Sequence, residues 1–185
     1  MDGAFERAFA VVLGHEGGYT ADPADPGNWT GGAPGRGECR GTNWGISAAS
    51  YPYLPIRALT REQACDVYRR DYWAKVRGDE LPPAVALLVF DAAVNSGTSR
   101  SARWLQQALG VPDDGALGPR TLAAVTHRVA SGQEQELCAE LLAVRLTFMT
   151  GLPTWPRFGR GWTRRIAHLA LQAAEMGPTI RGKAA

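Results

Sequence analysis

The sequence predicts a mainly α-helical protein with a small β-hairpin or loop lobe after the first helix. Apolar residues recur with helical spacing near the N-terminus and again over most of the chain beyond residue 60. Between about residues 19 and 56 that spacing is lost, and Gly, Pro, Asp, Asn and Trp predominate. The length of 185 residues, 45% of them apolar, suits one domain with a real core, or one domain with a small appendage.

The first helix is indicated by an apolar stripe that includes Phe9 and Val12, and the pair Gly17-Gly18 stops it. Thr60 and Gln63 match a capping box, which predicts a second helix running to about Val76. The next helix opens at Pro82-Pro83 and continues to Val94 with apolar residues on nearly every face. Because a helix that is apolar all round is usually buried, we expect this one to be the central core helix.

Four more helices are expected toward the C-terminus. One begins at Thr98 and ends at Gly110, and another has Pro119 as its first helical residue, a position that tolerates proline. The last two are expected at roughly 133–149 and 160–175, with Trp155-Pro156 breaking the chain between them.

Charge and cysteine content exclude several classes of function. A net charge of +2 gives no reason to expect a nucleic-acid binder. The three cysteines are widely spaced, so they predict neither a zinc site nor a disulfide framework, and we expect no metal. The N-terminus lacks a basic leader, and no apolar run is long enough to span a bilayer. We therefore expect cytoplasmic synthesis without a signal peptide, no stable membrane insertion, and a monomer.

The chain beyond Leu141 is basic, with seven Lys and Arg residues against Glu175 as the single acid. A basic segment favours an anionic surface such as a cell wall, a lipid or a nucleic acid. The alternative is an ordinary solvated helix face, and the sequence does not separate the two.

Glu16 is the first candidate for chemistry. It follows Val12 by four residues and Leu13 by three, so its carboxyl lies at the C-terminal edge of the apolar stripe. Partial burial and the negative end of the helix dipole both raise the pKa of a carboxyl, which a general acid at neutral pH requires. The alternative is a surface glutamate at a frayed helix end.

Asp25 is the candidate second carboxylate, with Asp22 as its rival. Two carboxylates flanking a sugar bond are the usual equipment of glycoside hydrolysis, where one donates a proton and the other handles water or charge. Asp25 follows Glu16 by nine residues, across a turn, so it can face Glu16. Asp-Pro pairs are also simple turn formers, which is the interpretation that we favour for Asp22.

Aromatic side chains gather in the same segment, together with amides and hydroxyls. Such groups suit sugar rings, which offer apolar faces and hydroxyl edges, so we predict Tyr19, Trp44 and Tyr51 as substrate-binding residues. Packing within the small lobe is the alternative. On the central helix, Asp91 and Asn95 share one face, because they lie four residues apart. We expect a structural role for Asp91 and include Asn95 among the substrate-binding candidates.

Five short motifs follow one another along the chain. They are Glu16-Gly17-Gly18-Tyr19, Asp22-Pro23-Ala24-Asp25-Pro26-Gly27, Thr42-Asn43-Trp44-Gly45-Ile46, Tyr68-x-x-x-Tyr72-Trp73 and Phe90-Asp91-Ala92-Ala93-Val94-Asn95-Ser96-Gly97. Together they resemble the signature of glycoside hydrolase family 108. Three later motifs resemble the peptidoglycan-binding region that usually follows in that family. These are Leu105-Gln106-x-Ala108-Leu109-Gly110, Asp114-Gly115-x-x-Gly118-Pro119-x-Thr121 and Gly161-Trp162-x-x-Arg165.

The resemblance implies a lysozyme-like fold and activity. It implies a catalytic region over 1–96, a helical peptidoglycan-binding region over 97–175 and a tail over 176–185. Glu16 takes the place of the family's acid. The spacing of Glu16 and Asp25 is also similar to that of phage-type lysozymes, which add a threonine in the β lobe, here Thr42 or Thr30.

One departure from the family pattern concerns residues 28–40, an insertion of about a dozen residues that is rich in glycine. Many relatives run almost directly from the Asp-Pro-Gly turn into the following strand. The insertion leaves the choice between Thr30 and Thr42 open, and it puts the position of Asp25 in doubt. Glu38, inside the insertion, is a weaker candidate carboxylate.

The leading prediction is a phage-type or prophage-type endolysin, a bacteriolytic N-acetylmuramidase that needs no cofactor. It would cleave the β-1,4 bond between N-acetylmuramic acid and N-acetylglucosamine, with Thr42 positioning water. We expect it to act on the wall after holin-type release or dedicated export. The alternatives are a lytic transglycosylase and a non-catalytic wall-binding protein. Retention or inversion depends on a carboxylate separation that the sequence does not give.

Overall fold

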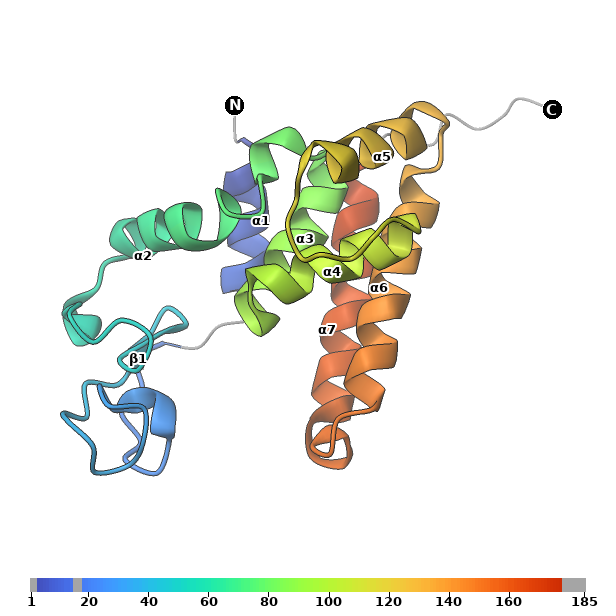
Figure 1. Cartoon of the computed structure of the whole chain (residues 1–185). Coiled ribbons are helices and arrows are strands. Elements are labelled where there is room, and N and C mark those ends of the chain that lie inside the picture. Colours follow the sequence, from blue (N-terminus) through green and yellow to red (C-terminus); the bar gives the residue numbers. More distant parts are fainter. Residues whose placement is uncertain (1–2, 15–17, 178–185) are drawn as a thin grey trace. The chain divides into compact units, whose positions relative to one another are not determined.

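The computed structural model describes residues 3–14 and 18–177, and these form two compact units. One, which we call the helical body, comprises described residues 3–8 and 71–177. The other, which we call the small unit, comprises 9–14 and 18–70. The α-helices within this described part are α1 (Ala4–Leu13), α2 (Arg61–Tyr68), α3 (Pro83–Ser96), α4 (Thr98–Leu109), α5 (Pro119–Ala130), α6 (Glu134–Thr150) and α7 (Trp155–Met176) (Figure 1).

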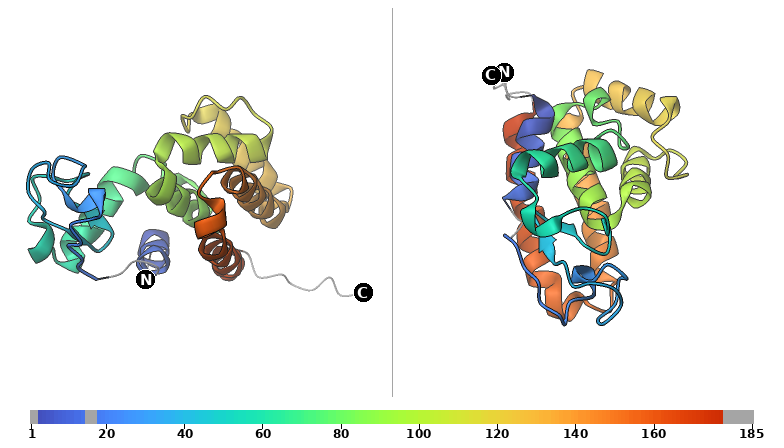
Figure 2. Two further views of the ribbon diagram at one scale, coloured as in Figure 1. Left: turned by 90° about the horizontal axis from the view of Figure 1, so that it is seen from below. Right: turned by 90° about the vertical axis from the view of Figure 1, so that its left-hand side faces the viewer.

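The core of the helical body is α3, as its sequence predicts. Every residue from Ala84 to Ala93 is buried, and α3 packs against α4, α6 and α7. In Figures 1 and 2, α6 and α7 run side by side over most of their length. An aromatic cluster joins the start of α1 to this core, because Phe5 lies edge-on to Trp73 at 5.3 Å and to Phe90 at 5.9 Å. None of the described helices is long and apolar enough to cross a membrane.

The small unit combines a two-stranded antiparallel sheet with short helical turns. Strand β1 (Thr42–Asn43) pairs with β2 (Ile46–Ser47). The short 3₁₀ turns η1 (Pro26–Asn28) and η2 (Ile56–Ala58) flank this hairpin in sequence. The predicted mainly α fold, with a small hairpin lobe after the first helix, is therefore confirmed. The predicted capping box is also present, since the Thr60 hydroxyl accepts from the Gln63 backbone and the Gln63 side chain from Thr60.

Two predicted helix boundaries were wrong. The helix expected to reach Val76 ends as an α-helix at Tyr68 and continues as a π-helical turn, η3 (Arg69–Trp73). A second short turn, η4 (Gly78–Glu80), follows it before α3. The last helix begins at Trp155 rather than near residue 160. Pro156 does not break it, because proline is tolerated in the first turn, where its missing N–H has no intrahelical partner.

Candidate active site

The predicted acid, Glu16, lies outside the described residues, whereas its predicted partners in the small unit lie within them. The turn that carries both aspartates is held by hydrogen bonds within itself. Asp22 Oδ1 accepts from the Ala24 backbone N–H at 2.9 Å, and Asp25 Oδ1 accepts from Gly27 N–H at 2.8 Å. Each carboxylate therefore uses one oxygen to cap the turn. Both side chains are exposed, which leaves the second oxygen of each accessible to water.

Asn28 ties this turn to strand β1, although sequence reasoning did not select it as a site residue. Its side chain is fully buried. The amide donates to the backbone oxygen of Asp22 at 3.0 Å, and its Oδ1 accepts from the Thr42 hydroxyl at 2.8 Å. The backbone oxygen of Asn28 accepts from the N–H groups of Arg40 and Gly41. The sequence feature that could have identified Asn28 is its place directly after the Asp-Pro-Gly turn. An asparagine there can stabilise the turn, because its side chain has both a donor and an acceptor.

Thr42 is thereby brought together with the aspartate turn. Its backbone pairs with that of Thr20 in both directions, at 2.8 and 2.9 Å, which fixes its place beside that segment. Because its hydroxyl hydrogen points to Asn28, the oxygen keeps acceptor capacity, and the side chain is only half-buried. Thr42 can therefore accept a hydrogen bond from a water molecule.

The other threonine candidate, Thr30, has a different task. The insertion folds as an irregular hairpin, in which Trp29 pairs with Cys39 and Thr30 N–H donates to the Glu38 oxygen. The Thr30 hydroxyl accepts from the Glu38 backbone N–H at 3.0 Å. The Trp29 indole donates to Pro23 O at 2.9 Å, so the insertion is tied back to the aspartate turn.

Glu38 is an exposed residue at this hairpin. It pairs with Arg40 at 2.7 Å, and this contact holds the pKa of Glu38 below its usual value. A carboxylate with a lowered pKa is unsuited to donate a proton at neutral pH.

The predicted aromatic residues occupy three different settings. The Tyr19 ring, 40% exposed, lies against Gly41, where an added Cβ would come within 2.8 Å of it. Trp44 is fixed at the tip of the β1–β2 hairpin by its indole, which donates to Leu59 O at 2.9 Å. Tyr51 follows β2, is half-buried, and its backbone N–H donates to Ser47 O. None of these three is in the core, so all keep some surface for a ligand.

The backbone at Trp44 is strained. The hairpin loop consists of Trp44 and Gly45, with φ angles of 54° and 73°, and positive φ at both loop residues matches the twist of the strands. Glycine adopts this conformation readily, whereas a tryptophan does so at a cost of about 1–3 kcal/mol. The Tyr68 hydroxyl offsets part of that cost by donating to Trp44 O at 3.0 Å.

Comparison with known proteins agrees with these motifs. The family model described as Glycosyl hydrolase 108 matches residues 9–97, and the model described as Predicted Peptidoglycan domain matches residues 100–167. The solved "Structure of Brucella abortus SagA" is 35% identical, with a TM-score of 0.77 and a match that covers 100% of each chain. No curated protein sequence matches. The chain belongs to glycosyl hydrolase family 108. It is a glycoside hydrolase, and with the second match it is a peptidoglycan hydrolase.

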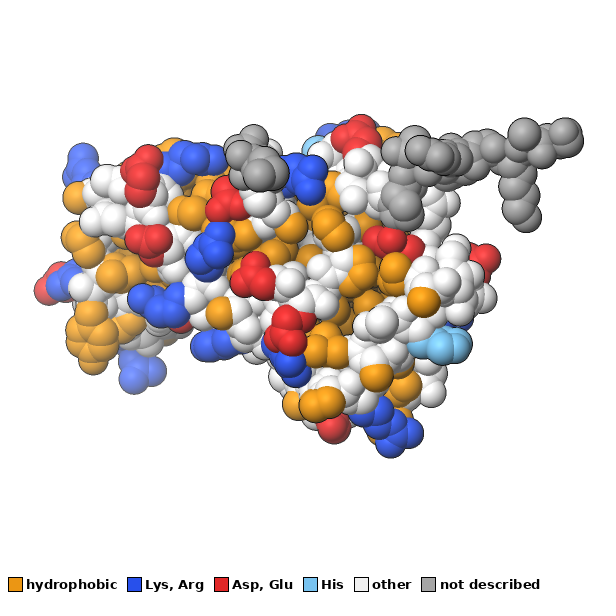
Figure 3. All heavy atoms as spheres, turned by 90° about the horizontal axis from the view of Figure 1, so that it is seen from above, with side chains coloured by type: hydrophobic (Ala, Val, Ile, Leu, Met, Phe, Trp, Pro, Cys, Tyr) orange, Lys and Arg blue, Asp and Glu red, His pale blue; other side chains and the backbone are white. Residues whose placement is uncertain are grey.

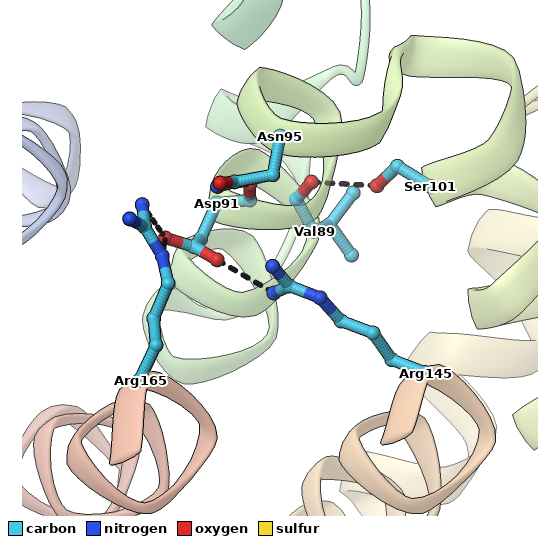
Figure 4. Close-up of polar contacts among 6 residues, drawn as sticks. All are labelled: Val89, Asp91, Asn95, Ser101, Arg145 and Arg165. Atoms are coloured by element: carbon cyan, nitrogen blue, oxygen red, sulfur yellow. Dashed lines mark hydrogen bonds and ion pairs between the residues drawn. The ribbon is translucent and has the colours of Figure 1, made fainter. Parts of the chain in front are cut away.

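The family-108 motif on α3 has a structural role. Asp91 is fully buried, and its two carboxylate oxygens accept from arginines of two other helices (Figure 4). Arg145 of α6 donates to Oδ2 at 2.5 Å, and Arg165 of α7 donates to Oδ1 at 2.6 and 3.0 Å. The structural role expected for Asp91 is confirmed, and its partners are two arginine side chains. Arg165 of the Gly161-Trp162-x-x-Arg165 motif is likewise explained.

Asn95 lies on the same helix, in the helical body, and is exposed. Its amide donates to Asp91 O at 2.7 Å, so its side-chain oxygen is the group left to accept from a ligand. Asn95 belongs to the helical body, whereas Thr42 and Trp44 belong to the small unit.

Two motifs of the peptidoglycan-domain match, the one at residues 105–110 and the one at residues 114–121, meet at Gln106. Its buried amide donates to Asp114 Oδ1, Ala116 O and Thr121 Oγ1, at 2.7 to 3.1 Å, and its oxygen accepts from Gly115 N–H. Hydrogen bonds from the Ala116 N–H and from the Gln106 amide hold the pKa of Asp114 below its usual value. Across the described residues, no group of three His, Cys, Asp or Glu side chains is placed to hold a metal.

The basic character of the C-terminal third is partly internal. Arg145 is 3% exposed and Arg165 is 14% exposed in their side chains, and both are committed to Asp91. On the face drawn in Figure 3, acidic and basic side chains are interspersed, with apolar side chains between them. The excess of arginine in the sequence therefore overstates the positive surface that this segment offers.

Proposed function

We propose that this family-108 hydrolase is an N-acetylmuramidase that cleaves the β-1,4 bond between N-acetylmuramic acid and N-acetylglucosamine. Glu16 protonates the glycosidic oxygen, Asp25 handles the attacking water or the developing charge, and Thr42 positions that water. The observation that carries the proposal is the hydrogen-bond chain from Thr42 through Asn28 to the aspartate turn. It supports Thr42 over Thr30, because Thr30 is engaged within the insertion hairpin.

The choice of Asp25 over Asp22 rests on its spacing from Glu16. Both residues cap the turn with Oδ1, so hydrogen bonding alone does not separate them. Asp25 keeps the nine-residue spacing from Glu16 that the resemblance implies. Tyr19, Trp44, Tyr51 and Asn95 are assigned to sugar binding in this proposal.

The proposed role is that of an endolysin, made in the cytoplasm and released to the wall by a holin-type pore or by dedicated export. Cys39, Cys65 and Cys138 form no disulfide with one another. Cysteines outside disulfides suit a protein made in a reducing compartment, and they support this part of the proposal.

The test is digestion of isolated peptidoglycan followed by mass spectrometry of the soluble products. Wild-type protein is expected to release muropeptides with reducing ends, and Glu16→Gln to be about 10²–10⁴-fold slower. Asp25→Asn and Thr42→Val are expected to impair release, whereas the matched variants Asp22→Asn and Thr30→Val are expected to retain it. Anhydro-muropeptides, with Asp25→Asn fully active, would identify a lytic transglycosylase instead. Sedimentation with the wall without products would identify a binding protein.

A further inference from the structure

A second site is suggested by a cavity in the helical body, where the start of α6 meets the end of α7. The cavity has a volume of about 280 Å³. Its walls are formed mainly by small apolar side chains, including Ala139, Leu142, Ala170 and Ala173. None of the described residues that line it is assigned above to catalysis or sugar binding. Its lining suits a short aliphatic chain, because such a chain makes dispersion contacts with methyl groups and needs no polar partner.

One polar group interrupts these apolar walls. Glu134, the first residue of α6, lines the cavity and is only 6% exposed. Its Oε1 is enclosed, yet it accepts no hydrogen bond. An enclosed carboxyl oxygen without a donor is costly, and native proteins rarely keep one without a reason. Burial raises the pKa of Glu134, as expected for a carboxyl that has no compensating partner.

The position of Glu134 in the helix does not explain its burial. Acidic residues are favoured in the first turn of any helix, where they offset the dipole from an exposed position. Glu136, in the same turn, is exposed in this way. Glu134 instead lines the cavity together with several alanines and the buried Cys138, whose thiol has a pKa raised by burial to about 12. No Lys, Arg or His is among the described residues that line the cavity.

We propose that this cavity binds an unbranched alkylammonium ion, with its methylenes against the alanine walls and its ammonium donating to the carboxylate of Glu134. A carboxylate and an ammonium form a charge-assisted hydrogen bond, about twice as strong as a neutral one. Free alkylamines carry this group, and so does the side chain of a diamino acid in a peptidoglycan stem peptide. The site is independent of the proposed muramidase activity.

The first experiment titrates the full-length protein with n-pentylammonium and follows backbone amide shifts by NMR. Shifts confined to residues around the cavity are expected. Glu134→Gln is expected to weaken binding about tenfold or more, because the charge-assisted bond is lost. The matched variant Glu136→Gln, on the same turn, is expected to bind as wild type does. Ala170→Leu places a larger side chain at the cavity from a solvent-exposed position and is expected to block binding.

Neutral 1-pentanol is the control ligand, because it has the same carbon chain as n-pentylammonium but no charge. Absence of n-pentylammonium binding to the wild-type protein would overturn the proposal. So would equal binding of alcohol and ammonium with no effect of Glu134→Gln, since the cavity would then be merely apolar.

The two sources of the ammonium are separated with a soluble muropeptide that carries a free side-chain amine, and with the same muropeptide after acetylation of that amine. Binding of the free form and not of the acetylated form identifies the stem peptide as the source. Binding of alkylamines alone identifies a small amine, and both results support the site. Arg181 and Lys183 lie in the C-terminal residues outside the described part. If n-pentylammonium binds only after both are replaced by alanine, the chain itself supplies the cation and the proposal is overturned.

Discussion

The helical body and the small unit are stabilised by different interactions. In the helical body, α3 is buried along ten consecutive residues, and one buried carboxylate, Asp91, ties it to α6 and α7. In the small unit the strands are two residues long, and the segment from Tyr19 to Ser47 is held mainly by hydrogen bonds among turns. Asn28 is the centre of that network.

This difference determines where each region is vulnerable. A buried ion pair is sensitive to the loss of one partner, because the remaining charges stay enclosed without compensation. A turn network loses one or two modest hydrogen bonds when a side chain is removed, and the damage stays local. The candidate catalytic residues Asp25 and Thr42 belong to the second kind of region, so their geometry depends on Asn28 more than on the apolar core.

The largest effect is expected from Asp91→Ala. It leaves Arg145, which is 3% exposed, without its carboxylate. We expect the free energy of unfolding to fall by about 3–5 kcal/mol, as measured by urea denaturation. The matched variant Asn95→Ala removes only an amide on an exposed face of the same helix and should change stability far less.

A triple variant sharpens this test. Replacing Asp91, Arg145 and Arg165 together by Leu, Met and Met removes every charge of the cluster. If unpaired charge is the cause, the triple variant should recover most of the stability lost in Asp91→Ala. A triple variant as unstable as the single one would mean that packing around α3, and not charge, dominates.

A smaller and local effect is expected from Asn28→Ala. The Thr42 hydroxyl and Asp22 O lose their partners, which costs about 1–3 kcal/mol where those groups stay shielded from water. Hydrogen exchange should speed up at the N–H groups of Arg40, Gly41 and Thr42, while the amides of α3 keep their protection. Peptidoglycan hydrolysis should fall as well, if Thr42 positions the water.

Thr30→Ala is the control for Asn28→Ala, because it removes one hydroxyl that accepts a single bond inside the insertion. Its faster exchange should be confined to Glu38 and its neighbours. Faster exchange in both units for either variant would show that the two regions open together and are not independently stabilised.

The same contrast explains which features could be predicted from the sequence and which could not. Apolar periodicity located α3 and α4, and the Thr60 capping box was readable because both its residues lie within four positions. Asn28 was not selected, because its partners Asp22 and Thr42 lie 6 and 14 residues away, and residue type alone does not identify them. The pairing of Asp91 with Arg145 spans 54 residues, so the sequence showed only that a buried aspartate needs partners.

The predicted helix boundaries were wrong where two sequence rules gave different answers or where no rule applied. The sequence pattern at Trp155-Pro156 predicts a break in the chain, although proline is also favoured in the first turn of a helix. Because α7 begins at Trp155, Pro156 lies in its first turn. The π-helical turn after Tyr68 has no reliable sequence signal, and it brings Trp73 into the core with its indole donating to Asp79 at 2.9 Å. The sequence therefore identified candidate site residues by their chemical type, but it did not predict their positions in the structure.

The smallest effect distinguishes the two regions by the sign of their pH dependence. Glu38, in the small unit, has a pKa lowered by Arg40, whereas Glu134, in the helical body, has a pKa raised by burial. A lowered pKa adds stability above the unfolded value, near 4.5, that is lost as the pH falls through the folded value. A raised pKa gives the opposite sign, because its contribution is present below 4.5 and is lost as the pH rises through the folded value.

Urea midpoints measured at about pH 4 and about pH 7 check both signs. Compared with wild type, Glu38→Gln should lose stability on going from the lower to the higher pH, whereas Glu134→Gln should gain it over the same interval. The Glu38 effect should also shrink in high salt, because its pair with Arg40 is exposed and screened. The Glu134 effect should persist in salt, since it arises from burial. Equal salt sensitivity in both variants would mean that Glu134 is solvated in solution, and that the cavity beside it is open to water.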